Sequence, residues 1–301
     1  MITSAADGGP RIRQAHLAGP SRRLDPRVHA FRPDLADIGL AGIVTAPRFA
    51  EGVVMHGVVA STMLRAAADD TAVAVSALLY GEQFTAFDVV HGWVWGQCGH
   101  DGYVGWVRAT ALRTGTGAPT HRVVAATAAI FTRPDIKTRV VGLLPLNARL
   151  AATSAVGDFV AAAGGYIHRR HVAVLADGNT AIAKDDAVAA ALGFVGTPYV
   201  WGGRTRDGID CSGLTQAVLA AGGIACPRDS DQQRDAFPAV EPASRRRGDL
   251  AVFPGHVGIL ADPLTLVHAN AHWMATVVEP LADVVARIEP LGFRRPMVDA
   301  G

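Results

Sequence analysis

The sequence predicts an α+β protein in which two small β-barrels precede a domain of helices and an antiparallel sheet. Short apolar runs, broken by turn-forming Asp-Gly and His-Gly pairs, occupy the chain up to about residue 112. A similar pattern returns about 65 residues later. Near residue 180 the pattern changes to helices followed by consecutive strands, which is typical of an α+β domain.

The 301-residue chain is nearly neutral, since 28 basic residues face 27 acidic ones. This balance does not favour the basic face of a nucleic-acid binder, and 50% hydrophobic with 18% charged residues indicates a globular chain. The longest apolar stretches, such as Val123–Phe131, span about nine residues, whereas a membrane-spanning helix needs roughly 20. We therefore expect neither a nucleic-acid nor a membrane partner, and the sequence does not indicate an oligomeric state.

Residues 1–37 contain several arginines and no continuous apolar core, so they do not have the pattern of a secretory signal. We expect them to form a disordered or loosely wrapped tail. The three cysteines, Cys98, Cys211 and Cys226, do not form a disulfide framework. With no export signal, we expect a cytoplasmic location.

The first barrel is expected over residues 38–115 and the second over residues 116–179. In the first, the predicted strands are Val73–Tyr80, Trp93–Gly96 and Tyr103–Val107. The segment that begins at Ser76 (SALLYGE) is echoed at Val141 (VGLLPLN), and the Gly-Tyr-Val at Gly102 is echoed by the Gly-Tyr-Ile at Gly165. Two copies of one small barrel explain both echoes.

Residues 180–299 are expected to form the α+β domain. The predicted helices are Lys184–Gly193, Cys211–Ala221 and one that opens with Ser230 as N-cap and Gln233 at N3 of a capping box. The predicted strands are Asp249–Phe253, His256–Leu260, Thr265–His268 and Ala275–Val278. Consecutive strands joined by short turns indicate an antiparallel sheet.

Cys211 lies where a Gly-rich extended stretch becomes a helix, in the context Asp-Cys-Ser-Gly. A thiol at a helix N-terminus faces the positive end of the dipole, so we expect its pKa to fall below the free value of about 8.5. Gly213 is expected to leave room for a substrate backbone near the sulfur. The alternative for a lone cysteine is a buried core thiol, and the Gly and aromatic residues around Cys211 favour a nucleophile.

A cysteine nucleophile needs a base and a group that orients the base. His256 and His268 lie 12 residues apart on strands predicted to be adjacent, joined by a turn around Asp262. Neighbouring strands lie about 4.8 Å apart, so the two imidazoles can share a hydrogen bond. We expect His256 to take the thiol proton and His268 to fix its orientation and tautomer. The alternative for each histidine, taken alone, is an ordinary edge or core residue. The presence of Cys211 in the same domain favours the catalytic interpretation.

These residues resemble the NlpC family of bacterial cell-wall cysteine peptidases. The resemblance covers about residues 180–297, through Pro-Tyr-Val-Trp-Gly-Gly, Asp-Cys-Ser-Gly-Leu, Pro-Arg-Asp-Ser and His-Val-Gly-Ile. It implies a papain-like core and cleavage of peptidoglycan stem peptides between γ-D-glutamate and a diamino acid. The family's Cys, His and third polar residue fall on Cys211, His256 and His268. Its motif tyrosine falls on Tyr199, whose hydroxyl is expected to help the Cys211 amide stabilise an oxyanion.

Two barrels ahead of such a domain resemble a murein-recycling subgroup of the family, in which the first barrel restricts substrates to those with a free N-terminal L-Ala. An ammonium group needs carboxylates and an aromatic neighbour. The resemblance assigns this role to Glu82, Tyr103 and Asp210, and assigns substrate polar groups to Ser212 and Ser230. The second repeat has Leu-Asn where the first has Gly-Glu, so only the first can supply the acid.

The sequence thus predicts a cysteine endopeptidase whose partner is a murein-derived tri- or tetrapeptide. We expect no cofactor and no metal, since histidines such as His100 lack metal-ligand spacing in the sequence. Two alternatives stay open. One is a cell-wall lytic amidase or acyltransferase on the same fold, and the other is a wall-binding module with an inactive catalytic domain.

Overall fold

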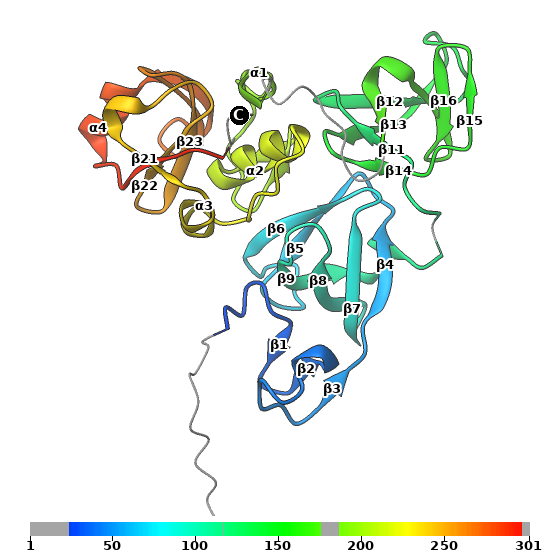
Figure 1. Ribbon diagram of the computed structural model, residues 1–301. Helices are drawn as coiled ribbons and strands as arrows, with labels where there is room; N and C mark the ends of the chain where they lie inside the picture. The colour runs from blue at the N-terminus through cyan, green and yellow to red at the C-terminus, as the bar shows by residue number, and fades with distance from the viewer. Residues whose placement is uncertain (1–23, 116, 176–186, 297–301) are drawn as a thin grey trace, which may run out of the picture.

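The computed structural model of the protein describes residues 24–115, 117–175 and 187–296. Residues 1–23 of the expected tail and the first residues of the helix predicted from Lys184 lie outside this part. Figure 1 shows three bodies: a first β-unit (residues 53–113) in the centre, a second β-unit (residues 121–174) beside it, and a C-terminal domain (residues 187–296) on the other side. None of the helices in the described ranges is long and apolar enough to cross a bilayer.

Part of the expected tail is ordered. Strand β1 (Phe31–Arg32) pairs with β2 (Leu35–Asp37), and β2 pairs with β3 (Phe49–Ala50). Leu35 is buried with Trp95 of the first β-unit in a small apolar cluster, so this segment is held by burial of its few apolar residues. The prediction of a loose tail is therefore wrong for this segment.

The first β-unit is a seven-stranded antiparallel sheet around one apolar core. Its order is β10-β4-β7-β8-β9-β5-β6. The strands are β4 (Val53–Gly57), β5 (Ser61–Arg65), β6 (Ala74–Leu79), β7 (Gln83–Val90), β8 (Trp93–Cys98), β9 (Val104–Arg108) and β10 (Leu112–Arg113). The strands alternate apolar residues inward, and Leu64, Phe84 and Val107 are fully buried in the core.

The second β-unit repeats this topology. Its strands are β11 (His121–Val123), β12 (Thr127–Phe131), β13 (Val140–Pro145), β14 (Arg149–Leu150), β15 (Ser154–Val156), β16 (Phe159–Ala162), β17 (Gly165–His168) and β18 (Val172–Val174). The order β13-β12-β17-β16-β15 matches β6-β5-β9-β8-β7 of the first unit, and β14-β11-β18 form a separate small sheet. A 3-10 helix precedes the last strand in both units, at Ala109–Ala111 and Arg169–His171.

The C-terminal domain contains helices and one antiparallel sheet. The helices are α1 (Ala187–Leu192), α2 (Cys211–Ala221), α3 (Ser230–Ala236) and α4 (Leu281–Arg287). A hairpin of β19 (Arg204–Thr205) and β20 (Gly208–Ile209) leads into α2. The sheet has the order β21-β26-β22-β23-β24-β25, from β21 (Ala239–Val240), β22 (Leu250–Phe253), β23 (His256–Asp262), β24 (Thr265–Asn270), β25 (Ala275–Pro280) and β26 (Gly292–Arg294).

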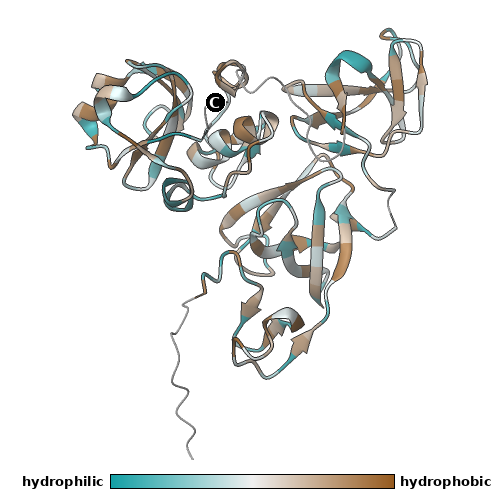
Figure 2. Cartoon of the chain, in the orientation of Figure 1, coloured by the Kyte–Doolittle hydropathy of each residue, from teal (hydrophilic) through white to brown (hydrophobic). Residues whose placement is uncertain are grey.

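Helix α2 lies at the centre of this domain. All of its residues except Ala220 are buried, and its apolar side chains pack against α1, β23 and β24. Helix α3, by contrast, is hydrophilic along its length (Figure 2). It lies beside α2 at the edge of the domain (Figure 1), and its buried Gln233 accepts a hydrogen bond from Thr215 of α2 at 2.6 Å.

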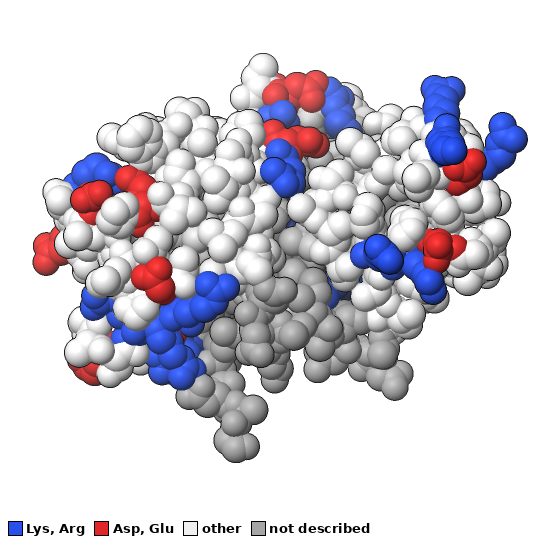
Figure 3. Space-filling view, turned by 90° about the horizontal axis from the view of Figure 1, so that it is seen from above, with Lys and Arg blue, Asp and Glu red and all other residues white. Residues whose placement is uncertain are grey.

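Both β-units contact the C-terminal domain through the same turn of the repeat. In the first unit this turn carries Glu82, whose carboxylate is bonded to Arg204 on β19. In the second unit it carries Asn147, which donates to the Ala217 carbonyl of α2 at 2.8 Å. The first repeat has Gly-Glu where the second has Leu-Asn, and the two turns contact different parts of the C-terminal domain, β19 and α2. On the face seen in Figure 3, one mainly basic group lies at the lower left, and the other charged residues of both signs are scattered.

Candidate active site

Cys211 is the first residue of α2, as the sequence predicts. Its N-cap, Asp210, accepts the Gly213 N–H on Oδ1 at 2.7 Å. Only 5% of Cys211 is exposed, and its sulfur lies against the backbone N–H of Val257 on β23. The start of the helix therefore holds the thiol beside the strand that begins with His256.

His256 and His268 lie on the adjacent strands β23 and β24 and contact each other. Nε2 of His256 is 2.8 Å from Nδ1 of His268. Gly258 makes this arrangement possible, because a Cβ at that position would come within 2.9 Å of the His268 Cβ. The His-Val-Gly segment thus places the Val257 N–H against the sulfur of Cys211 and leaves space for the contact between the two histidines.

Behind His268 lie two side chains that the sequence patterns did not single out. Glu279 on β25 places Oε2 2.8 Å from Nε2 of His268, and Asn270 on β24 places Nδ2 at the same distance from that nitrogen. Arg287 on α4 donates to both oxygens of Glu279. Asn270 follows His268 by two residues and so shares its face of β24, which is the one sequence signal that could have found it.

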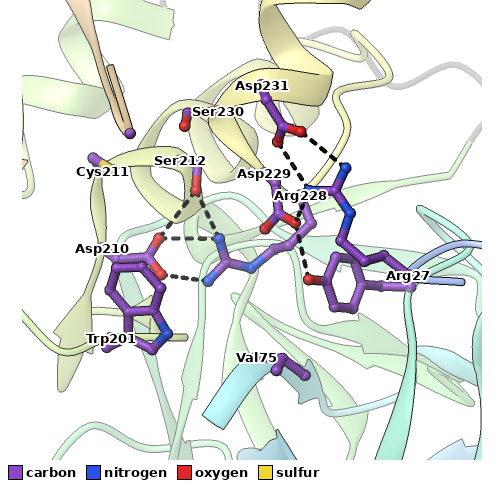
Figure 4. Close-up of a pocket in the computed structure, with 12 residues that line it drawn as sticks. Arg27, Val75, Trp201, Asp210, Cys211, Ser212, Arg228, Asp229, Ser230 and Asp231 are labelled. Atoms are coloured by element: carbon purple, nitrogen blue, oxygen red, sulfur yellow. Dashed lines mark hydrogen bonds and ion pairs between the residues drawn. The ribbon is translucent and has the colours of Figure 1, made fainter. Parts of the chain in front are cut away.

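A cavity of about 260 Å³ opens beside Cys211 at the junction of three parts of the chain. Figure 4 shows its walls, which come from α2, α3, the first β-unit and the N-terminal segment. The lining residues are Arg27, Val75, Tyr103, Trp201, Asp210, Cys211, Ser212, Arg228, Asp229, Ser230, Asp231 and Gly255. Of the predicted substrate-binding residues, Tyr103, Asp210, Ser212 and Ser230 therefore line one cavity with Cys211.

One side of the cavity carries two aspartates that pair with one arginine. The Tyr103 hydroxyl donates to Oδ2 of Asp229 at 2.9 Å, and burial raises the pKa of both groups. Arg27 donates to the same oxygen at 2.8 Å and also to Asp231 (Figure 4). Asp229 was not predicted as a site residue, although it stands in the quoted Pro-Arg-Asp-Ser segment. Arg27 had no sequence signal, because it falls in the expected tail.

Asp210 lines the cavity but is occupied by contacts within the protein. Besides capping α2, it accepts both terminal nitrogens of Arg228, at 3.0 and 2.6 Å. Arg228 is buried and donates to the Ser212 hydroxyl at 2.9 Å. This ion pair joins the start of α2 to the segment ahead of α3, so Asp210 holds the cavity wall in place.

Glu82 does not line the cavity, which corrects the role predicted for it. The residue is 3% exposed. Its carboxylate accepts Nη1 and Nη2 of Arg204 and the backbone N–H of Leu79. A buried carboxylate needs such compensation, and here the guanidinium of the C-terminal domain supplies it. The acid of the first β-unit therefore serves the domain interface.

The sequence profile of the NlpC/P60 family matches residues 196–283, which contain α2, both histidines and most of the sheet. This chain carries an NlpC/P60 domain. The profile of the bacterial dipeptidyl-peptidase Sh3 domain matches residues 64–112, within the first β-unit. The two profiles agree with the division between the first β-unit and the C-terminal domain.

Curated relatives of the NlpC/P60 domain include two dipeptidyl-peptidases. Dipeptidyl-peptidase 6 of Lysinibacillus sphaericus is 38% identical over 89 residues, which are 29% of this chain and 32% of that protein. Gamma-D-glutamyl-L-lysine dipeptidyl-peptidase of Bacillus subtilis (strain 168) is 28% identical over 119 residues, 37% of this chain and 40% of that one. The matches thus span less than half the length of either relative.

A solved structure extends the likeness of fold beyond the NlpC/P60 domain. The crystal structure of an NlpC/P60 family protein from Bacillus cereus ATCC 10987 superposes with a TM-score of 0.73 and covers 82% of this chain and all of that one. The sequence identity is 21%. At this identity the similarity concerns the fold alone.

Burial governs the electrostatics of the NlpC/P60 domain. It raises the pKa of Cys211 to about 11, with a further contribution from the neighbouring Asp210 carboxylate. It also lowers the pKa of His256 to about 3, helped by His268. The prediction of a lowered thiol pKa is therefore wrong, because desolvation outweighs the helix N-terminus and the backbone N–H groups. At neutral pH the thiol and the imidazole are both uncharged.

Three further details correct the sequence-based picture. A Cβ at Gly213 would come within 2.2 Å of the Gly203 carbonyl, so this glycine lets α2 approach the protein's own backbone rather than a substrate. The N-cap of α3 is Asp229, not Ser230, and Gln232 rather than Gln233 closes the capping box. Asp229 takes the cap because its backbone is extended while Ser230 is already helical.

Tyr199 packs against the core of the NlpC/P60 domain near Cys211. It is half-buried, and burial together with the proximity of Cys211 and Asp210 raises its pKa. A phenol that stays protonated can donate a hydrogen bond over the whole physiological pH range. This agrees with the donor role that the sequence predicts for Tyr199, without testing it.

Cys98, His100 and Asp101 bring potential metal-ligating atoms within 4.8 Å of one another, although their spacing in the sequence did not suggest it. Asp101 already accepts the N–H groups of Tyr103 and Gln216. Burial holds the Cys98 pKa well above its ordinary value, which disfavours a thiolate ligand. His100 lies 3.0 Å from Asp101 and 3.7 Å from Glu82, so this group belongs to the polar cluster around Glu82.

Proposed function

We propose that this protein is a cysteine endopeptidase that hydrolyses the bond between γ-D-glutamate and a diamino acid in peptidoglycan stem peptides with a free N-terminal L-Ala. Its substrates are murein-derived tri- or tetrapeptides, and the reaction fits a cytoplasmic recycling step. The names of the two dipeptidyl-peptidase relatives support this substrate class. The single observation that carries the proposal is that Cys211, beside a cavity, lies against the N–H of Val257, the residue next to His256, and that His256 is paired with His268.

In the proposed reaction, Cys211 gives its thiol proton to Nδ1 of His256, the ring nitrogen not engaged by His268. The sulfur attacks the γ-carbonyl carbon of D-glutamate. The Cys211 N–H and the Tyr199 hydroxyl stabilise the oxyanion that forms. The C–N bond then breaks, and the His256 imidazolium gives its proton to the leaving amine of the diamino acid.

The acyl-enzyme is a thioester, which water hydrolyses. His256 accepts a proton from water, and the hydroxide attacks the thioester carbonyl. Collapse of the second oxyanion breaks the C–S bond, and the proton returns to the sulfur of Cys211. The products are L-Ala-γ-D-Glu and the diamino-acid fragment, and no cofactor or metal enters the balance.

Recognition of the free amine is assigned to Asp229 and Tyr103 in place of Glu82. Asp229 is a carboxylate on the cavity wall, and the Tyr103 ring and hydroxyl stand beside it. Asp229 and Asp231 share Arg27 as their partner, so the pair keeps one negative charge in excess, and an ammonium ion would find that charge beside the Tyr103 ring. Ser212 and Ser230 supply hydroxyls for the polar groups of the dipeptide. The cavity of about 260 Å³ is small, which suits a peptide end better than a cross-linked wall strand.

The proposal includes the domain assignments 38–115 and 116–179 as two SH3-like barrels and 180–299 as a papain-like domain. The shared strand order of the two β-units supports the second barrel. In this arrangement only the first barrel borders the catalytic cavity, through Val75 and Tyr103. The second barrel binds the Ala217 carbonyl of α2 through Asn147 and supports the helix that carries Cys211.

The test is turnover of L-Ala-γ-D-Glu-meso-diaminopimelate, with dipeptide release followed by mass spectrometry. Cys211→Ala should lower release by at least about 10³-fold, and Cys226→Ala, which removes another buried thiol, should retain activity. Equal turnover of the N-acetylated peptide would favour a lytic amidase or acyltransferase. Peptide binding without any turnover by the unaltered protein would favour a wall-binding module. Unchanged activity of Cys211→Ala would overturn the mechanism.

A further inference from the structure

Nε2 of His268 faces one acceptor and one donor at equal distance. Glu279 Oε2 and Asn270 Nδ2 both lie 2.8 Å from it. The direction of the Asn270 amide is set independently, because its Oδ1 accepts the Trp273 N–H at 2.8 Å and so turns the NH2 group toward His268. All three side chains, at 1%, 8% and 6% exposed, are shielded from water. Only one of the two contacts to Nε2 can be satisfied at a time.

Whether Nε2 of His268 donates or accepts a hydrogen bond determines the tautomer of both His268 and His256. If Nε2 of His268 carries the hydrogen, it donates to Glu279, and Nδ1 of His268 is an acceptor. Nε2 of His256 must then carry a hydrogen and donate to that Nδ1 across 2.8 Å. Nδ1 of His256 is left with a lone pair, which is the state that can take the thiol proton of Cys211.

If Nε2 of His268 accepts a hydrogen bond instead, His256 cannot act as the base. If Asn270 donates to Nε2 of His268, that ring carries its hydrogen on Nδ1 and donates to Nε2 of His256. His256 then holds its hydrogen on Nδ1, where it can no longer accept the thiol proton. Asn270 can avoid this conflict by turning its N–H toward Glu279 Oε2, which lies at 3.4 Å.

We infer that Glu279 is a positioning residue that sets both histidines in the tautomer competent for proton transfer, and that it does so against the competing donor Asn270. Arg287 supports this role by donating to both oxygens of Glu279, at 2.9 and 2.8 Å, which keeps the side chain an ionised acceptor. The inference rests on the proposed function for the roles of Cys211 and His256. The tautomers themselves are a property of the free protein.

Glu279→Gln is the decisive variant because it preserves size and hydrogen-bonding capacity. Arg287 can only donate, so it will hold the amide oxygen and turn the NH2 group toward His268. Two donors then face Nε2, and both imidazoles should change tautomer. Asp283→Asn removes an exposed carboxylate from the neighbouring helix α4 and serves as the matched control.

The first readout is ¹H–¹⁵N correlation spectroscopy of the imidazoles in the free protein, with assignments from His256→Gln and His268→Gln. We expect the unaltered protein and Asp283→Asn to carry hydrogens on Nε2 of both rings, and Glu279→Gln to carry them on Nδ1. The same tautomers in Glu279→Gln as in the unaltered protein would overturn the inference. No substrate is involved, so this result stands apart from any failure of the proposed function.

The second readout is kinetic. Glu279→Gln should lower kcat by at least about 10²-fold with KM within about twofold, since loss of the right tautomer affects proton transfer rather than binding. Glu279→Asp should recover part of the activity, and Asn270→Ala, which removes the competing donor, should leave the tautomer unchanged. A kcat of Glu279→Gln equal to that of Asp283→Asn in a protein with unchanged unfolding temperature would overturn the inference.

Discussion

Arg204 of the C-terminal domain binds both carboxylate oxygens of Glu82 in the first β-unit, at 2.9 and 3.1 Å. Both side chains are almost completely buried. Arg204 also donates to the Ala77 carbonyl at 2.6 Å, so one guanidinium fastens two points of the β-unit. The first β-unit is thereby joined to the C-terminal domain through a buried ion pair.

The first prediction concerns this buried pair. Arg204→Met leaves Glu82 buried without a counter-charge and should lower the free energy of unfolding by about 3–5 kcal/mol, measured by urea titration. Arg206→Met, at an exposed position two residues on, is the control and should unfold like the unaltered protein. Identical midpoints for the two variants would contradict the role assigned to the pair.

The second prediction separates Asp229 from Glu82 in substrate binding. Asp229→Asn keeps a capping side chain at the start of α3 but removes the charge that the substrate ammonium needs. We expect KM for the free peptide to rise at least about tenfold, the loss of one charge-assisted contact. The double variant Glu82→Met/Arg204→Met, which removes the buried pair together, should keep its KM. A large KM increase in the double variant alone would return the ammonium site to Glu82.

The third prediction concerns the ionisation of Cys211. Because burial raises its pKa to about 11, the rate of alkylation by iodoacetamide should climb steadily from pH 7 toward pH 11. The measurement is the labelled fraction of the tryptic peptide that contains Cys211, with Cys226→Ala used to simplify the spectrum. A plateau already reached at pH 7 would show that the free site holds a thiolate.

The fourth prediction follows from the neutral His256. Its pKa is about 3 in the folded protein against an ordinary 6.5, so the unfolded chain binds more protons between these values. The stabilising contribution is therefore complete above pH 6.5 and is lost as pH falls toward 3. Urea unfolding of His256→Gln should depend less on pH in this window than that of the unaltered protein. Equal pH dependence in both would contradict the assigned pKa.

Local patterns account for much of the C-terminal domain. The helix Cys211–Ala221 is confirmed residue for residue, and His256 and His268 meet on adjacent strands as their spacing predicts. These features depend on neighbours in the sequence: apolar periodicity, glycine turns and the alternation of a strand. The α+β class of the domain follows from the same patterns, since helices precede consecutive strands.

The sequence by itself determined the order of the elements, the position of Cys211 at the start of a helix and the pairing of His256 with His268 on adjacent strands. Only the tertiary structure decided which carboxylate faces the cavity, because that depends on how two domains pack: Arg204 takes Glu82 into the interface and leaves Asp229 on the cavity wall. It also decided the ionisation of Cys211, since desolvation comes from distant parts of the chain and outweighs the local helix dipole. Local sequence patterns select the candidate residues, and long-range packing sets their charge and surroundings.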